Sequence, residues 1–251
     1  NGGTGEVPER VDGGLNLDGI LLSNDTIGYR GPAHGEPYVL AVGSVTKASS
    51  LAMLEEIVIA DKDETVEYSR VEWTHWAGTE GRSCWSVRVE VLYRDSVPGT
   101  VVFMDKEKNP AEYEEACAIG TPVEDENGEI SINAENSGKW IDPYSGKEVN
   151  NASELDIDHI IPLMNAAQSG GQDWSSELKK IFANDPDNLL ATSASENRSK
   201  GAKGPAEYIP PYRAYRCQYS KSYISVAYKY ELTITEDDYK VLSEEVNSCL
   251  H

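Results

Sequence analysis

The segment that most restricts the fold of this 251-residue chain is the decapeptide ELDIDHIIPL, residues 154–163. Apolar and polar residues alternate over its first half, which predicts a short, half-buried β-strand. The strand ends on Asp158 and His159, and the chain then runs straight into Pro162. Two interpretations are open: a solvated strand edge, or a metal ligand beside a general base. The decapeptide alone does not choose between them.

The residues that follow narrow the choice. A second short apolar strand carries Asn188, and a polar helix that ends near Gly201 carries Asn197. An Asp-His pair alone is common at strand ends, so the order and the spacing carry the argument. Strand, strand and helix, with Asp-His first and two asparagines after, is the order of a ββα-metal finger. The sequence therefore favours a metal site with a general base.

At these residues the chain resembles HNH endonucleases. The motif as it stands is DIDHIIPL…NLLATSASENRSKG, with Asn197 in the final position, where other members carry His. The HNH domain of RNA-guided DNA nucleases is similar in this order. A closer likeness, over roughly residues 48–250, is to small secreted bacterial HNH nucleases related to the C-terminal domain of GmrSD-type restriction enzymes. It includes GRSCWSVRVEVLYRDS, DPYSG, SGGQDWSSELKKIFANDPDNLL and NRSKGAKGPAEYIPP, with Tyr208 where Trp is expected.

The resemblance implies a role for each residue of the motif. His159 is the expected base, since a neutral imidazole can take a proton from an attacking water. Asp158 and Asn197 are the expected ligands of one divalent cation, which offsets charge that grows in the transition state. Their oxygen atoms suit Mg²⁺, with Mn²⁺ as an alternative. Asn188 is expected to brace the hairpin and to orient the histidine loop. Asp156 is expected on the opposite strand face, with a structural role.

The predicted fold class is α+β, a ββα-metal finger embedded in a mostly helical domain with short antiparallel strands. Residues 1–44 are rich in Gly and turn formers and predict an arm of uncertain structure. The nuclease domain is expected to occupy residues 45–251, with the finger at about 154–203. Residues 44–60 have apolar residues at helical spacing and predict a helix. Residues 84–96, CWSVRVEVLYRDS, fit either a strand or the first part of a helix.

The C-terminal part of the chain predicts helices. DWSSELKKIFAND has a helix start at Asp173 or Ser175, and ITEDDYKVLSEEVNSCL has a capping pattern that begins at Thr235. Between them, tyrosines recur at spacings that place them on one face of a helix, as a core stripe: Tyr208, Tyr212, Tyr215, Tyr219 and Tyr223. Residues 105–140 are acidic and predict surface loops with a hairpin.

The net charge of the chain is −21, yet one stretch is basic. Residues 198–229 hold seven Lys and Arg against one acid, Glu207. Such a strip can hold a polyanion, and the alternative is a solvated helix face. The residues expected to contact substrate are Arg198, Lys200, Lys203, Arg213 and Arg216. Phosphate contacts carry no sequence information, and no reader module is recognisable, so cleavage with little sequence preference is expected. Base reading through unrecognised loops is the alternative.

Four cysteines, none in a C-x-x-C pair, argue against a zinc knuckle and suit two disulfides in an oxidising compartment. Four reduced, buried thiols are the alternative. The predicted pairs are Cys84–Cys117 and Cys217–Cys249. No apolar run is long enough to span a membrane, and the polar, Gly-rich start is typical of a mature or trimmed N-terminus.

The expected function is that of a secreted, Mg²⁺-dependent endonuclease that cuts DNA, and RNA as a further substrate, leaving 5′-phosphate ends by analogy with the family. It is expected to act as a monomer without a membrane partner. One alternative is an interbacterial toxin nuclease with an inhibitor or immunity protein as its partner. Another is a noncatalytic nucleic-acid-binding module, which the intact set Asp158, His159, Asn188 and Asn197 disfavours because a binder needs no base.

Overall fold

The computed structural model describes residues 45–75, 86–103, 119–124, 126, 130–133 and 138–249. All of them belong to one compact unit, Gly31–His251. The predicted arm at residues 1–44 and the predicted pair Cys84–Cys117 lie outside the described residues. The α+β class is confirmed, since helices combine with short antiparallel strand pairs.

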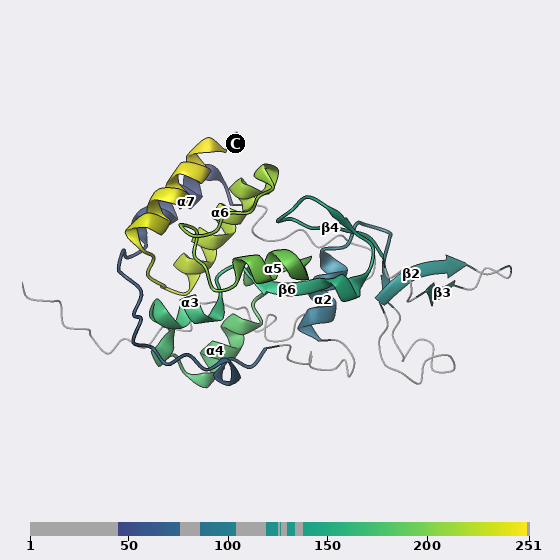
Figure 1. Cartoon of the computed structure of the whole chain (residues 1–251), viewed down its shortest axis with the longest axis horizontal. Coiled ribbons are helices and arrows are strands. Elements are labelled where there is room, and N and C mark those ends of the chain that lie inside the picture. Colours follow the sequence, from purple (N-terminus) through teal and green to yellow (C-terminus); the bar gives the residue numbers. More distant parts are fainter. Residues whose placement is uncertain are drawn as a thin grey trace, which may run out of the picture. The chain divides into compact units, whose positions relative to one another are not determined.

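The finger has the predicted order of elements (Figure 1). Strand β6 (Leu155–His159) pairs antiparallel with β7 (Leu189–Ser193), and His159 lies opposite Leu189. Helix α5 (Ala194–Lys200) follows β7 directly, because the Ser193 side chain accepts a hydrogen bond from the Glu196 backbone N–H and caps the helix. The cap at Ser193 therefore ends β7 and starts α5.

Two helices and two 3-10 turns connect β6 to β7. Pro162 precedes α3 (Leu163–Gln168), where its fixed φ is tolerated. The turn η4 (Gly171–Asp173) leads to α4 (Ser176–Ala183), which the Ser175 side chain caps as predicted. The turn η5 (Pro186–Asn188) then enters β7. This connection brings the end of α4 and Asn188 beside the end of β6.

Helix α2 (Val87–Arg94) resolves the segment for which strand and helix were both open. The Ser86 side chain accepts from the Val89 backbone N–H at its start, and Val91 and Leu92 are buried against both finger strands. Asp95 accepts a hydrogen bond from the Ala191 backbone N–H at 2.8 Å. A strand with unpaired edge groups invites pairing with another chain, so this helix also protects the edge of β7.

The finger packs on a core that it shares with α2 and a short hairpin. That hairpin pairs β4 (Trp140–Ile141) with β5 (Glu148–Val149) and encloses the DPYSG turn. The buried apolar residues of this core are Val91, Leu92, Val101, Trp140, Val149, Leu155, Ile157, Leu189 and Ala191. A separate three-stranded antiparallel sheet contains β1 (Val102–Phe103), β2 (Ile119–Glu124) and β3 (Ile130–Asn133).

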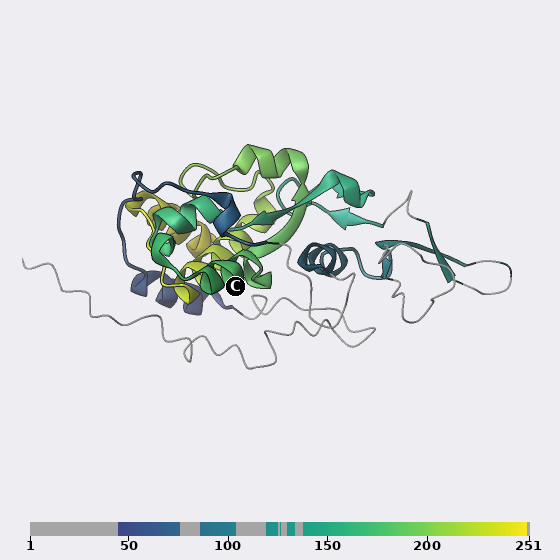
Figure 2. The same ribbon diagram turned by 90° about the horizontal axis from the view of Figure 1, so that it is seen from below.

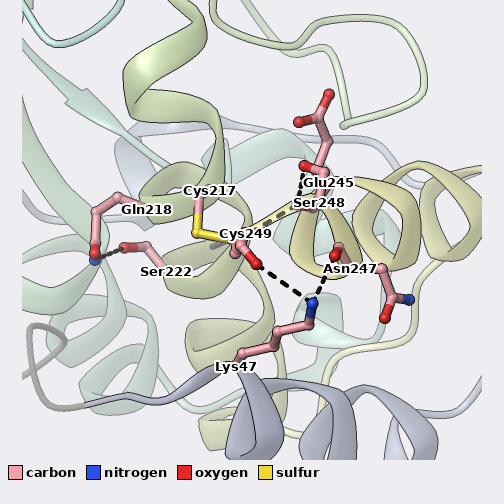
Figure 3. The surroundings of a disulfide bond; sticks show 8 residues. All are labelled: Lys47, Cys217, Gln218, Ser222, Glu245, Asn247, Ser248 and Cys249. Atoms are coloured by element: carbon pink, nitrogen blue, oxygen red, sulfur yellow. Dashed lines mark hydrogen bonds between the residues drawn. A yellow bond between two sulfur atoms is a disulfide. The ribbon is translucent and has the colours of Figure 1, made fainter. Parts of the chain in front are cut away.

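Three helices pack together beside the finger: α1 (Lys47–Glu56), α6 (Arg213–Lys229) and α7 (Glu236–Ser248) (Figures 1 and 2). The predicted disulfide Cys217–Cys249 joins α6 to the residue after α7 (Figure 3). Lys47 of α1 donates to the backbone carbonyl of Cys249 at 3.3 Å. The end of α7 is therefore attached to both neighbouring helices.

In this helical part, one prediction from the sequence was wrong and another is confirmed. The tyrosine stripe was expected on one helix from Tyr208, but α6 begins only at Arg213, because the two prolines at 210 and 211 cannot continue a helix. Tyr219 and Tyr223 are buried, whereas Tyr212 is 44% exposed. The Thr235 side chain caps α7 as predicted. None of the helices within the described ranges has the length and apolar character that crossing a membrane requires.

The remaining described elements are two short 3-10 turns. Turn η2 (Arg70–Glu72) precedes Trp73, a buried residue that packs edge-on against Phe182 of α4. Turn η3 (Ala152–Glu154) leads from β5 into β6, and the Asn151 side chain caps it. Turn η3 therefore lies at the start of the finger, and η2 lies beside the Trp73 contact with α4.

Candidate active site

His159 is the last residue of β6, and its side chain is 6% exposed. Its Nε2 lies 2.9 Å from the carbonyl oxygen of Ala183, the last residue of α4. A carbonyl oxygen only accepts, so Nε2 carries the hydrogen and Nδ1 is the ring nitrogen that can take up a proton. The end of α4 therefore sets the tautomer that a general base needs.

The imidazole is neutral at physiological pH. Burial lowers the pKa of His159 from its ordinary value of 6.5 to about 3, and the positive charges of Lys200 and Arg70 and the nearby His75 act in the same direction. The hydrogen bond to Ala183 opposes them. Burial dominates because a charged imidazolium loses its hydration there.

Asp158 lies on the other face of β6 and is 5% exposed. Its Oδ2 is 2.9 Å from the Lys200 ammonium and 2.6 Å from the Tyr144 hydroxyl, and its Oδ1 is 3.1 Å from the ammonium. Burial raises the pKa of Asp158, while the charge of Lys200 and the Tyr144 hydroxyl oppose that shift. The carboxylate is therefore held by one cation and one hydroxyl donor.

Asn197 lies on α5 and contacts the same face of β6. Its Nδ2 donates to the Asp156 Oδ2 at 3.1 Å. The expectation that Asp156 and Asp158 lie on opposite faces was wrong, because residues two apart in a strand share a face. The face of β6 toward α5 therefore carries both carboxylates.

Asn188 is fully buried at the end of η5. Its Oδ1 accepts from the Ile161 backbone N–H at 2.8 Å, and its Nδ2 donates to the Ile161 carbonyl oxygen at 3.3 Å. The Asn188 carbonyl also accepts from the Ile160 N–H at 2.8 Å. These contacts hold the loop that follows His159, so this side chain is placed to orient the histidine.

Asp142 and Tyr144 were not predicted as site residues, although the DPYSG turn that carries them is part of the family likeness. Asp142 is fully buried and accepts from Thr192 and Ser145 at 2.6 Å, from Ser193 at 2.8 Å and from the Tyr144 N–H at 3.0 Å. Burial alone would raise the pKa of Asp142, but these hydrogen bonds lower it. A buried carboxylate thus joins the turn that carries Tyr144 to the start of α5.

The residues of the predicted basic strip do not form one surface. Lys200 is buried against Asp158, and Arg216 donates to the Pro210 carbonyl oxygen at 2.8 Å. Lys229 bridges Asp185 and Asp187 at 2.9 and 3.1 Å. The residues of the strip that are largely exposed are Arg198, Lys203 and Arg213. Internal ion pairs therefore take up part of the positive charge that the sequence shows.

The residue types fit the divalent cation that the motif implies. Asp158 and Asn197 offer oxygen ligands, and Mg²⁺ keeps several waters, so two protein ligands suffice. No cluster of three His, Cys, Asp or Glu side chains occurs in the described part of the chain. The ammonium of Lys200 against both Asp158 oxygens shows that this carboxylate already has a cation as its partner.

Comparisons with known proteins indicate the family of the chain. Residues 131–245 match the C-terminal domain of GmrSD restriction endonucleases, which indicates a nuclease-type function. An uncharacterized secreted protein from Arthroderma benhamiae is 32% identical over 210 residues, which are 83% of this chain and 87% of that protein. No solved structure matches the chain. The chain therefore belongs to the family of the GmrSD C-terminal domain, an HNH-type nuclease family.

Proposed function

We propose that this chain is an endonuclease that hydrolyses phosphodiester bonds of DNA with His159 as the general base. The observation that carries the proposal is the His159 ring, which is neutral and is fixed at the end of β6 through Nε2 by the Ala183 carbonyl. Such an imidazole is prepared to take a proton at Nδ1. The nuclease-type family supports the same conclusion.

The reaction needs a water to attack phosphorus while a sugar oxygen leaves. His159 takes the proton of that water at Nδ1 as the new P–O bond forms. With 5′-phosphate ends, as the family resemblance implies, the 3′ oxygen is the leaving group. A pKa of about 3 makes His159 a weak base in the free protein. A phosphate beside the ring raises this pKa, because a nearby negative charge favours the imidazolium.

Asp158 and Asn197 are the residues that would hold a Mg²⁺ or Mn²⁺ ion. When bound there, a divalent cation supplies positive charge that offsets the negative charge growing on the phosphate. The fold holds both side chains at the face of β6 that lies toward α5, with Asp158 on β6 and Asn197 on α5. Asn188 holds the loop after His159 through Ile161.

Substrate binding is assigned to the exposed cations of the basic strip, Arg198, Lys203 and Arg213. Their contacts with phosphates give affinity without reading bases, which supports cleavage with little sequence preference. RNA has the same phosphodiester backbone and is included as a substrate. Arg216 and Lys200 make internal contacts, so their contribution to binding is expected to be smaller.

Secretion is proposed on two observations. The disulfide Cys217–Cys249 suits an oxidising compartment, and the similar protein from Arthroderma benhamiae is described as secreted. Each is compatible with a free extracellular enzyme and with a toxin that is delivered together with an immunity partner.

The test is cleavage of supercoiled plasmid by the purified chain with Mg²⁺, with Mn²⁺, and with EDTA. The expected result is conversion to nicked, linear and then smeared DNA that requires a divalent cation. End-labelling then checks for 5′-phosphate ends, and a structured RNA in a parallel lane checks the second substrate. Plasmid that stays intact with both metals while the protein still binds DNA would make the noncatalytic binding module the better account.

A further inference from the structure

Lys200 occupies an unusual place for a lysine, since its side chain is 0% exposed. Its ammonium contacts both oxygens of Asp158, at 2.9 and 3.1 Å, and the carbonyl oxygen of His159 at 2.7 Å. Lysine is almost never fully buried unless it is paired. The finger is therefore built around a lysine charge at the carboxylate that the family resemblance assigns to the metal.

The position of Lys200 in its helix limits what its side chain can reach. It is the last residue of α5, and Gly201 ends the helix with a φ of 54°, a conformation that favours glycine. The ammonium is directed inward to β6, whereas Lys203, three residues on, is exposed and donates to the Ser199 carbonyl oxygen. Lys200 cannot contact a phosphate while it remains in these contacts.

We propose that Lys200 is the resident counter-cation of Asp158 and that it competes with the divalent cation for this carboxylate. This inference rests on the metal site of the proposed function. Two cations at one carboxylate repel each other, so a metal ion binds Asp158 only by displacing the ammonium or by sharing the oxygens with it. In the metal-free protein, Lys200 keeps the buried charge of Asp158 paired.

Tyr144 is the partner of Asp158 that stays in place in this proposal when the cation changes. Its hydroxyl donates to Asp158 Oδ2 at 2.6 Å, and its ring packs against those of Tyr208 and Tyr219. Asp142 holds the backbone of Tyr144 through its N–H. The carboxylate of Asp158 therefore keeps an orienting donor whether its cation is the lysine or a metal ion.

The experiment is Lys200→Met in the full chain, which keeps the length of the side chain and removes its charge. Binding of Mg²⁺ and Mn²⁺ is measured by calorimetry without nucleic acid. We expect the Kd to fall at least about tenfold, because an unpaired buried carboxylate is costly and the metal restores its partner. The melting temperature of this variant then rises more with added metal than that of the unchanged protein.

Two further variants identify the cause. Lys203→Met removes a nearby exposed charge and is expected to leave the Kd for the metal unchanged. Lys200→Met combined with Asp158→Asn removes both charges and is expected to lose the stabilisation by metal. A Kd that stays the same or rises in Lys200→Met overturns the proposal.

Folding of the single variant is part of the readout. If Lys200→Met folds only when a divalent cation is present, the competition is supported directly. If it stays unfolded in saturating Mn²⁺ while the double variant folds, Asp158 cannot take a metal and the proposal is overturned. If neither variant folds, the slowly exchanging ammonium signal of Lys200 in the unchanged protein decides: its shift on metal addition supports competition, and its constancy overturns it.

These measurements are separate from the test of the proposed function, because they use no nucleic acid. A protein that shows the competition but cuts no DNA contradicts the proposed reaction and leaves this inference standing. A protein that cuts DNA but whose Lys200→Met variant binds metal no tighter supports the proposed reaction and overturns this inference.

Discussion

His159 and Asp158 are neighbours in the sequence, yet the pleat of β6 directs their side chains to opposite faces. His159 is held from the α4 side by Ala183, and Asp158 is held from the α5 side by Lys200. The strand thus separates the proposed base from the carboxylate that pairs with a cation. Each can then be positioned by its own set of neighbours.

The burial of His159 makes the stability of the fold depend on pH. Its pKa is about 3 in the folded protein and about 6.5 when unfolded, so the unfolded chain binds more protons between these values. The free energy of unfolding therefore falls as pH is lowered from 6.5 toward 3, with a contribution of up to about 1.4 kcal/mol per pH unit. Urea unfolding at pH 6.5 and 5 should show this loss, and His159→Gln should reduce it.

Other groups also titrate in this range, so the comparison between variants isolates the histidine. His75→Gln is the matched control, because His75 is partly exposed. It is expected to keep the pH dependence of the unchanged protein. A His159→Gln variant with the same pH dependence would show that the histidine is not buried as described.

At the residue scale, the order and spacing of residues reveal a motif, but they do not predict which side chains are buried. The finger residues follow from short-range order, which made Asp158, His159, Asn188 and Asn197 recognisable. From the sequence alone, Lys200 was predicted to be an exposed cation. Its burial depends on packing against β6, which is remote in the sequence. The same holds for Tyr144 and Asp142, which look like residues of an ordinary turn.

Among the elements, the DPYSG turn connects more than its length indicates. Through Asp142 it reaches Thr192 at the end of β7 and Ser193, which caps α5. Helix α5 carries Asn197 and Lys200, and the turn itself carries Tyr144. One carboxylate therefore sets the relative positions of two elements that contribute to the site.

Asp142→Ala should both destabilise the fold and impair the reaction. Hydrogen bonds to a charged group are worth about 1.5–3 kcal/mol each and are not additive, so we expect a loss of about 3 kcal/mol or more in the free energy of unfolding. DNA cleavage should fall even at temperatures where the variant is folded, because α5 and Tyr144 lose their common anchor. Urea unfolding and cleavage rates measure the two effects.

The control for this prediction lies on the same hairpin. Glu148 forms an exposed ion pair with Lys139, and such pairs contribute little to stability because water screens them. Glu148→Ala should therefore change neither property much. Equal effects of the two substitutions would contradict the role given to Asp142.

The elements themselves were predictable where their signals are local. Serine and threonine caps identified the starts of α4 and α7, and alternation identified β6. The segment of α2 stayed ambiguous, because its valines alternate as in a strand while its short apolar run also fits a helix. Burial of Val91 and Leu92 against the finger decides for the helix, and that contact is long-range.

On the scale of the whole molecule, the net charge of −21 and the internal pairing of basic residues predict a shallow dependence of DNA cleavage on salt concentration. Each phosphate contact contributes about −0.9 to the slope of log affinity against log salt concentration. The three exposed cations of the strip, Arg198, Lys203 and Arg213, therefore predict a slope of about −3 or shallower for log(kcat/KM), measured at fixed Mg²⁺ on duplex DNA.

Variants of single cations test the assignment. Arg213→Gln should make the slope shallower by about 1, as expected for a phosphate contact. Arg216→Gln should change it less, because this side chain already donates to Pro210 and lies near Glu245. A slope steeper than about −6 would mean that the internally paired cations also reach the phosphates.

DNA cleavage by the whole molecule depends most on His159 as the proposed base, and single-turnover cleavage of a labelled duplex by His159→Ala tests this role most directly. General base catalysis contributes about 10²–10⁴-fold, so the variant should lose at least a hundredfold in rate while its circular dichroism and DNA affinity stay unchanged. His75→Ala, measured alongside, should cut at the rate of the unchanged protein. A His159→Ala variant that cuts within a few fold of that rate would contradict the account.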